Sequence, residues 1–140
     1  SMRTWLKLLG SSEHGMAETV VPQVLRLVRF PRRPSIRVGD KIALYVLGYD
    51  RVFGIVEAFS PIREGEGDNP WDKWFLDVRE VMSLPYADSP RLDYISVSGR
   101  DLGASIRQQS HIQLREPEYR RAVELLLAAG AVEDGLYRAF

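Results

Sequence analysis

The sequence of 140 residues contains no cysteine. This absence excludes disulfides, thiol nucleophiles, thiolate zinc sites and iron–sulfur clusters, and it fits a reducing, cytoplasmic location. All apolar runs are far shorter than the ~20 residues that span a bilayer, and no signal-peptide pattern begins the chain, so we expect no membrane partner. Lys plus Arg and Asp plus Glu both number 19, so no net charge draws the chain toward nucleic acid.

Motifs for catalysis and metal binding are also missing. The two histidines, His14 and His111, are far apart, and neither has a partner at metal-ligand spacing. No GxSxG, GxxxxGK[ST] or GxGxxG pattern occurs. The acidic loop 60–72 alternates its carboxylates as calcium loops do, but Phe75 stands where a bidentate acid would be needed. We therefore expect no catalytic residue, no metal and no cofactor.

The proportions of hydrophobic and charged residues predict a folded protein. Hydrophobic residues make up 45% and charged residues 27%, and a chain of this length forms one domain, here residues 2–140. The basic residues are sixteen Arg and only three Lys: Lys7, Lys41 and Lys73. Arg binds phosphates in a two-point geometry and stacks on bases, although a GC-rich genome would give the same bias.

Apolar segments separated by turn residues predict a series of short strands. A turn at 48–50 between two apolar runs indicates a hairpin of strands 41–47 and 51–59. Gly54, inside the second strand, indicates a bulge or a tight bend at a barrel corner. The other predicted strands are 5–9, 20–30, 73–82, 92–97 and 112–114. Because 41–47 and 51–59 are apolar on both faces, we expect them to lie between a barrel interior and a covering helix.

One helix is predicted clearly, at 117–129. Pro117 suits its first turn and Gly130 its C-terminal cap. Apolar residues at the spacing i, i+3, i+4, i+7 form a stripe: Tyr119, Ala122, Val123 and Leu126. One or two helical turns are also expected over 101–108. The fold class is therefore α+β, a small, mostly antiparallel barrel of about five or six strands with flanking helices.

Two groups of residues are candidates for binding a ligand. Five Arg fall between 26 and 37, and Arg32 and Arg33 are the candidates for phosphate contact; the alternative is a charged edge strand that resists aggregation. Trp71 and Trp74 could stack on a flat ligand or pack in the core. Ser11 and Ser12, in the loop after the first strand, could form hydrogen bonds to the polar edge of a ligand ring, or they could simply stabilise the turn.

The runs Ile36–Val46 and Val52–Glu57 resemble the second and third strands of the PUA-like superfamily, and most closely its EVE branch. The strand that begins at Trp5 and the ending Ser110–Leu114, followed by Pro117-Glu118-Tyr119, are also similar to EVE domains. The resemblance implies a pseudo-barrel related to YTH, ASCH and SRA domains. It implies a non-catalytic module that captures a modified base, such as a cytosine derivative, in an aromatic-lined pocket at the barrel mouth.

The implied partner is DNA or RNA that contains a modified base, and the resemblance implies pocket positions at Ser11, Trp71 and Trp74. Ser12, in the same loop as Ser11, is the fourth ligand-binding candidate. Two alternatives stay open. An ASCH-like amidohydrolase acting on a modified nucleoside would need a Lys, a Thr and a Glu in the pocket, and this chain has only two Thr. A protein-interaction barrel without nucleic acid is compatible with the neutral net charge.

Overall fold

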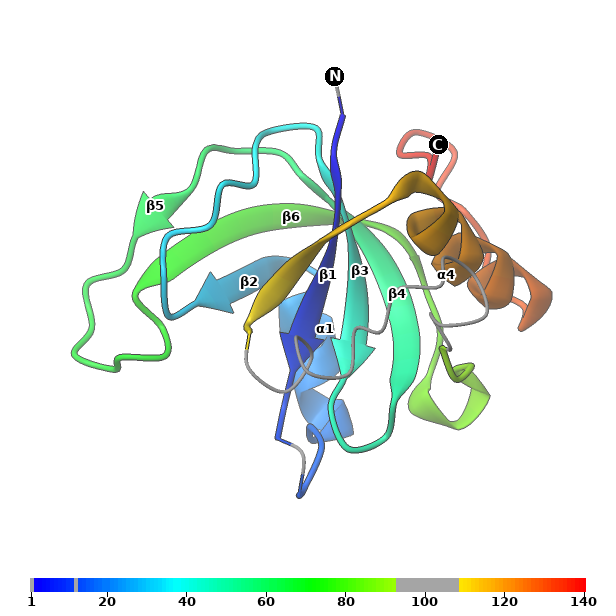
Figure 1. Ribbon diagram of the computed structural model, residues 1–140, viewed down its shortest axis with the longest axis horizontal. Helices are drawn as coiled ribbons and strands as arrows, with labels where there is room; N and C mark the ends of the chain where they lie inside the picture. The colour runs from blue at the N-terminus through cyan, green and yellow to red at the C-terminus, as the bar shows by residue number, and fades with distance from the viewer. Residues whose placement is uncertain (1, 12, 93–108) are drawn as a thin grey trace.

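The computed structural model describes residues 2–11, 13–92 and 109–140. A strongly curled sheet forms a half-barrel, and helix α4 packs on one side of it (Figure 1). The strands are β1 (Thr4–Leu9), β2 (Leu27–Phe30), β3 (Lys41–Val46), β4 (Arg51–Ala58), β5 (Arg63–Glu64), β6 (Trp74–Ser83) and β7 (His111–Leu114). The helical segments are η1 (Glu18–Val20), α1 (Val21–Val24), η2 (Tyr86–Asp88) and α4 (Glu116–Ala128).

The strands follow the order β2-β6-β4-β3-β1-β7, with the short β5 paired to β6. Neighbours are antiparallel except β1 and β3, which run parallel. The predicted α+β fold with a small, mostly antiparallel barrel is therefore confirmed, and the sheet closes as a half-barrel (Figure 1).

The predicted hairpin is present as β3 and β4, with Lys41 opposite Glu57 and Val46 opposite Arg51. The register shifts where Leu44 pairs with Gly54, so the predicted bulge is confirmed. A side chain at position 54 would meet the Met82 carbonyl oxygen at 3.1 Å, which explains why a glycine stands there.

The central strands are buried on both faces, as the sequence predicted. One apolar cluster lies under α4 and takes Leu6 and Leu8 from β1. The other lies within the curl of the sheet and takes Trp5 from β1 and Phe30 from β2. Alternation along β1 thus sends its side chains into two different environments.

Helix α4 presents the predicted stripe to the first cluster, and all four stripe residues are buried. At its start, the Arg115 backbone N–H donates to Glu118 Oε1 at 2.8 Å. At its end, Gly130 adopts a φ of 105°, which a glycine tolerates at this capping position.

The prediction of one strand over 20–30 is wrong in its first half. Residues 18–24 form η1 and α1, and only Leu27–Phe30 is a strand, paired with β6. Pro22 falls in the first turn of α1, where its missing N–H removes no helical hydrogen bond.

Two other predicted segments, 92–97 and 101–108, lie outside the described residues except for Leu92, which is in no strand. No helix among residues 2–11, 13–92 and 109–140 is long and apolar enough to cross a membrane.

Candidate ligand-binding cleft

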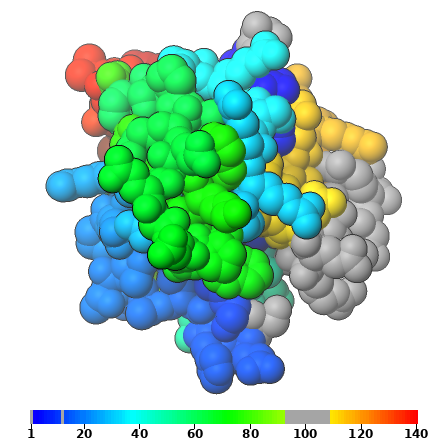
Figure 2. Space-filling model, turned by 90° about the vertical axis from the view of Figure 1, so that its left-hand side faces the viewer, coloured from blue at the N-terminus to red at the C-terminus, as the bar shows by residue number. Residues whose placement is uncertain are grey.

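An open cleft of about 1110 Å³ lies at the end of the half-barrel where β1 leaves the sheet. It is lined by β1, α1, β2, the 70–73 segment and the start of β7. Figure 2 shows several of these chain segments meeting on one face, with α1 and its surroundings in blue and the 60–75 region in green. Four of the described lining residues are basic and one is acidic: Lys7, Arg29, Arg32, Lys73 and Asp72. A chain of net charge zero thus concentrates positive charge at this cleft.

Lys7 lies at the base of the cleft on β1. Its side chain is only 5% exposed, and its ammonium nitrogen lies 4.4 Å from the centre of the Phe30 ring. No hydrogen-bond acceptor or ion-pair partner among the described residues contacts this nitrogen. Because burial disfavours the charged form, the pKa of Lys7 falls to about 8, although the charge of Asp72 opposes this shift.

His111 lies beside Lys7, because β7 pairs with β1 in the register that puts these two residues opposite each other. Its ring contacts the Trp5 ring at 5.7 Å and the Phe30 ring edge-on at 5.2 Å. Burial, and then the positive charge of Lys7, lower the pKa of His111 to about 4. His111 is therefore neutral at physiological pH, and its Nδ1 lies 2.8 Å from Ser110 Oγ.

Asp40 holds the aromatic wall behind His111 in place. Its buried carboxylate accepts a hydrogen bond from Trp5 Nε1 at 2.9 Å and others from the backbone N–H groups of Arg3 and Arg37, both at 3.0 Å. Asp40, which lies within the run Ile36–Val46 and directly before β3, therefore does more than start a strand. It fixes the indole against which His111 packs.

The rim of the cleft is formed by the segment before β6. Asp72 is paired with Arg29 at 3.4 Å and also accepts a hydrogen bond from the Asn69 side chain at 3.1 Å. Trp71 lines the cleft, yet 71% of its surface is exposed. An indole this exposed offers a free face for stacking.

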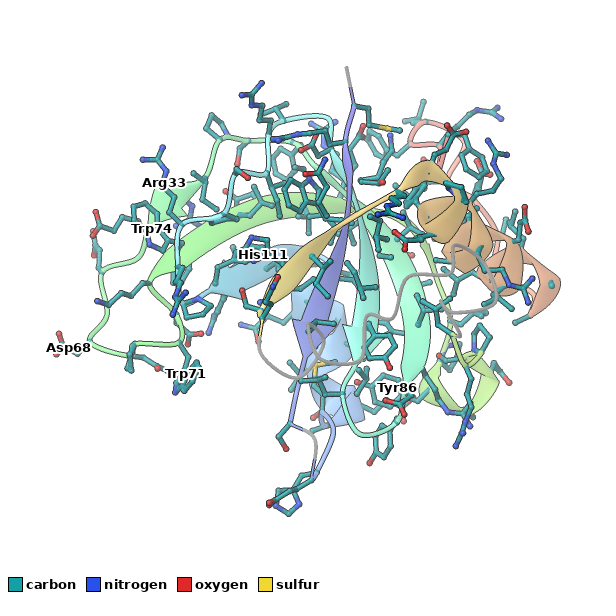
Figure 3. The ribbon with its side chains drawn as sticks, viewed as in Figure 1. Arg33, Asp68, Trp71, Trp74, Tyr86 and His111 are labelled. Atoms are coloured by element: carbon teal, nitrogen blue, oxygen red, sulfur yellow. The ribbon has the colours of Figure 1, made fainter. Side chains whose placement is uncertain are left out.

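The structure brings only some of the predicted site residues together. Trp71 and Arg32 both line the cleft. Trp74 and Arg33 do not; instead, the Arg33 guanidinium lies over the Trp74 ring at 5.3 Å from its centre. Figure 3 shows this pair on one side of the 66–74 region and Trp71 pointing away on the other.

Ser11, in the loop after β1, does not contribute to the cleft. Ser11 pairs with Gly15 in a tight turn, and its Oγ accepts a hydrogen bond from the His14 backbone N–H at 3.0 Å. It does not line the cleft, and Ser12 lies outside the described residues. This geometry is the turn chemistry that the sequence offered as the alternative.

Sequence reasoning missed Lys7 and His111, which form the base of the cleft. A signal was present for Lys7, because it is the one polar residue in the apolar run Trp5–Leu9 and alternates onto the face of Trp5. His111 had no such signal, since only the pairing of β1 with β7 brings it there. Within the described parts of the chain, no cluster of His, Asp and Glu could hold a metal ion.

Comparison with protein-family models finds no match, and comparison with curated proteins finds none either. Solved structures do share the fold. A hypothetical protein from Leishmania major superposes with a TM-score of 0.60 at 16% identity, covering 91% of this chain and 96% of that one. An ASCH protein from Zymomonas mobilis gives 0.58 at 13% identity, covering 88% and 96%.

The YTH domain of the Zygosaccharomyces rouxii MRB1 protein, solved in complex with N6-methyladenosine RNA, superposes with a TM-score of 0.53 at 13% identity and covers 97% of this chain and 92% of that one. The chain therefore has the half-barrel architecture found in ASCH and YTH proteins. At these identities the likeness concerns the fold. The narrower resemblance to EVE domains remains a prediction.

Proposed function

We propose that this protein is a non-catalytic module that binds DNA or RNA and holds a modified base in the cleft. The observation that carries the proposal is the concentration of four basic side chains around a cleft with an exposed indole at its rim. Cations neutralise phosphates and give affinity, while an aromatic face stacks on a base of any sequence. The YTH structure solved with methylated RNA supports this class of partner for the fold.

The residues have separable roles in this proposal. Arg32 is exposed at the rim and contacts the phosphate backbone, whereas Trp71 stacks on the captured base. The ion pair between Arg29 and Asp72 holds the 70–73 segment in place beside them. Arg33 stays a candidate for phosphate contact outside the cleft, while its partner Trp74 packs partly against the inner cluster.

The amidohydrolase alternative finds less support among the described residues. Lys7 lies in the cleft, but the Thr4 hydroxyl donates to the Leu114 carbonyl oxygen and Thr19 does not line the cleft. No glutamate is among the described lining residues either. The described part of the chain therefore does not assemble a Lys, Thr and Glu together.

The test is a salt titration of oligonucleotide binding, measured by fluorescence anisotropy with labelled single-stranded DNA and RNA. Arg32→Ala should weaken binding to every oligonucleotide and flatten the slope of log affinity against log salt by about 0.7. Trp71→Ala should cost about 1–3 kcal/mol of binding free energy and leave the slope nearly unchanged.

Matched controls lie away from the cleft. Arg121→Ala removes an exposed guanidinium from α4, and Phe59→Ala removes an exposed ring at the end of β4; neither should change affinity. If the wild-type protein binds no oligonucleotide more tightly than about 100 μM at low salt, the proposal is wrong, and a protein-interaction barrel takes its place.

A further inference from the structure

The base of the cleft contains a lysine that forms no ion pair with any described residue, although the charge of Asp72 acts on it from a distance. Lys7 is almost fully buried, and its nitrogen contacts the Phe30 ring rather than a carboxylate. A buried ammonium without an ion-pair partner is costly, and such charges are normally paired. If Lys7 only filled space in the core, an apolar side chain would serve as well, as Leu6 and Leu8 do on the other face of the strand.

No charged group among the described lining residues forms an ion pair with Lys7. Asp72 is the one acidic residue among the described lining residues, and it is already paired with Arg29. His111 is neutral, and the remaining charged lining residues, Arg32 and Lys73, are cations. Among the described lining residues, no carboxylate without another partner faces the Lys7 ammonium, so an anionic oxygen of a bound ligand would find its charge unpaired.

We infer that Lys7 determines ligand specificity by binding an anionic oxygen of the molecule held in the cleft. This inference rests on the proposed function and narrows it to a ligand class: a base or nucleotide that carries an anionic group. The anion is either a carboxylate on the base or a phosphate on the sugar. The neutral His111 ring and the Ser110 hydroxyl lie beside Lys7 and provide polar contacts without adding charge.

Two pairs of small probes distinguish the sources of the anion, with binding measured by calorimetry. The first pair is a pyrimidine nucleoside with a 5-carboxylate and the same nucleoside with a neutral 5-carboxamide. The second pair is a nucleoside 5′-monophosphate and the unphosphorylated nucleoside. In one of these pairs the anionic member should bind about 10- to 100-fold more tightly, as expected for a buried, charge-assisted hydrogen bond.

The Lys7→Met variant connects this preference to the residue. Met is a flexible apolar residue of similar length, so it should fill the site while removing the charge. The preference for the anionic member should disappear in Lys7→Met and persist in the Arg121→Met control on α4. Lys7→Arg, which keeps the charge, should retain part of the preference.

A pH series gives a second readout that a structural role would not produce. An anion stabilises the charged form of Lys7, so binding takes up a proton where the free side chain is neutral. Because the pKa of free Lys7 is about 8, the affinity of the wild-type protein should fall as the pH rises above 8 and approach a tenfold loss per pH unit. The probes for this series are cytosine nucleosides, because their base does not titrate above pH 8. The affinity of Lys7→Met for them should not change over this range, in which His111 is neutral and neither a carboxylate nor a phosphate of the probe titrates.

The outcomes separate this inference from the proposed function. If oligonucleotides bind in a Trp71-dependent manner but neither anionic probe is preferred, the inference about Lys7 is overturned while the proposed function survives. A preference that persists in Lys7→Met also overturns it. If neither oligonucleotides nor nucleosides bind, the proposed function itself has failed.

Discussion

The two faces of strand β1 differ in what covers them. Leu6 and Leu8 belong to an apolar cluster that the thirteen-residue helix α4 covers. The helix contributes its apolar stripe to this cluster. Trp5 and Lys7 face the inside of the half-barrel, where the covering helix α1 has only four residues and the cleft stays open.

This difference indicates what each side does. On the α4 side, each buried apolar side chain of the stripe adds to stability by removing apolar surface from water. On the cleft side, β1 and β7 place a lysine and a histidine among aromatic rings, at a cost in stability. Strand β1 thus stabilises the fold with one face and presents polar groups to the cleft with the other.

The largest effect is expected on the α4 side. Leu126 is fully buried in the stripe, so Leu126→Ala should lower the free energy of unfolding by about 2–5 kcal/mol. Arg121→Ala, on the exposed side of the same helix, should change it by less than about 0.5 kcal/mol. Urea unfolding measures both, and equal losses would contradict the assignment of the faces of α4.

The second prediction concerns the opposite face and has the opposite sign. Lys7→Met should stabilise the protein at pH 7 by up to about 3 kcal/mol, because lowering the lysine pKa from 10.5 to about 8 corresponds to 1.36 kcal/mol per unit. Between pH 8 and 10.5 the unfolded chain binds a proton that the folded chain does not, so wild-type stability rises with pH and the advantage of the variant shrinks.

Unfolding curves of the two proteins at pH 7, 9 and 10.5 measure this difference. A variant that is less stable than the wild type at pH 7 would show that the contact between Lys7 and Phe30 outweighs the cost of burial. The conclusion that the cleft-facing side of β1 lowers the stability of the protein would then be wrong.

The α4 side and the cleft side of β1 also differ in how much of their structure the sequence predicted. Helix α4 and the β3–β4 hairpin were predicted because their signals are local: a stripe at helical spacing, capping residues and a turn with a following bulge. The inner side depends on pairings between distant segments. Neither the parallel pairing of β1 with β3 nor the position of β7 beside β1 has a local signature.

The same distinction applies to the candidate site. Trp71 and Arg32 were identified because an aromatic residue in a polar loop and a cluster of five Arg between 26 and 37 are visible in the sequence. Trp74 and Arg33 are residues of the same two types. However, the pleat of β6 and the path of the 31–37 segment place them against each other, outside the cleft. Residue types could be read from the sequence, whereas the direction of each side chain depended on the fold.

The smallest predicted effect isolates the histidine of the inner face. Because burial and Lys7 hold the pKa of His111 near 4, below the usual 6.5, the unfolded chain binds more protons between these values. The stability associated with neutral His111 is present above pH 6.5 and is lost as the pH falls toward 4. For a partly exposed ring, solvent screening reduces this loss to about 1–2 kcal/mol.

His111→Phe keeps an aromatic ring against Trp5 and Phe30 but cannot take up a proton. Carboxylates titrate alike in both proteins, so the difference between their unfolding free energies at pH 7 and pH 4 reports His111 alone. The wild type should lose more stability than the variant on acidification, and parallel losses would show that His111 is not held in its neutral form by the cleft.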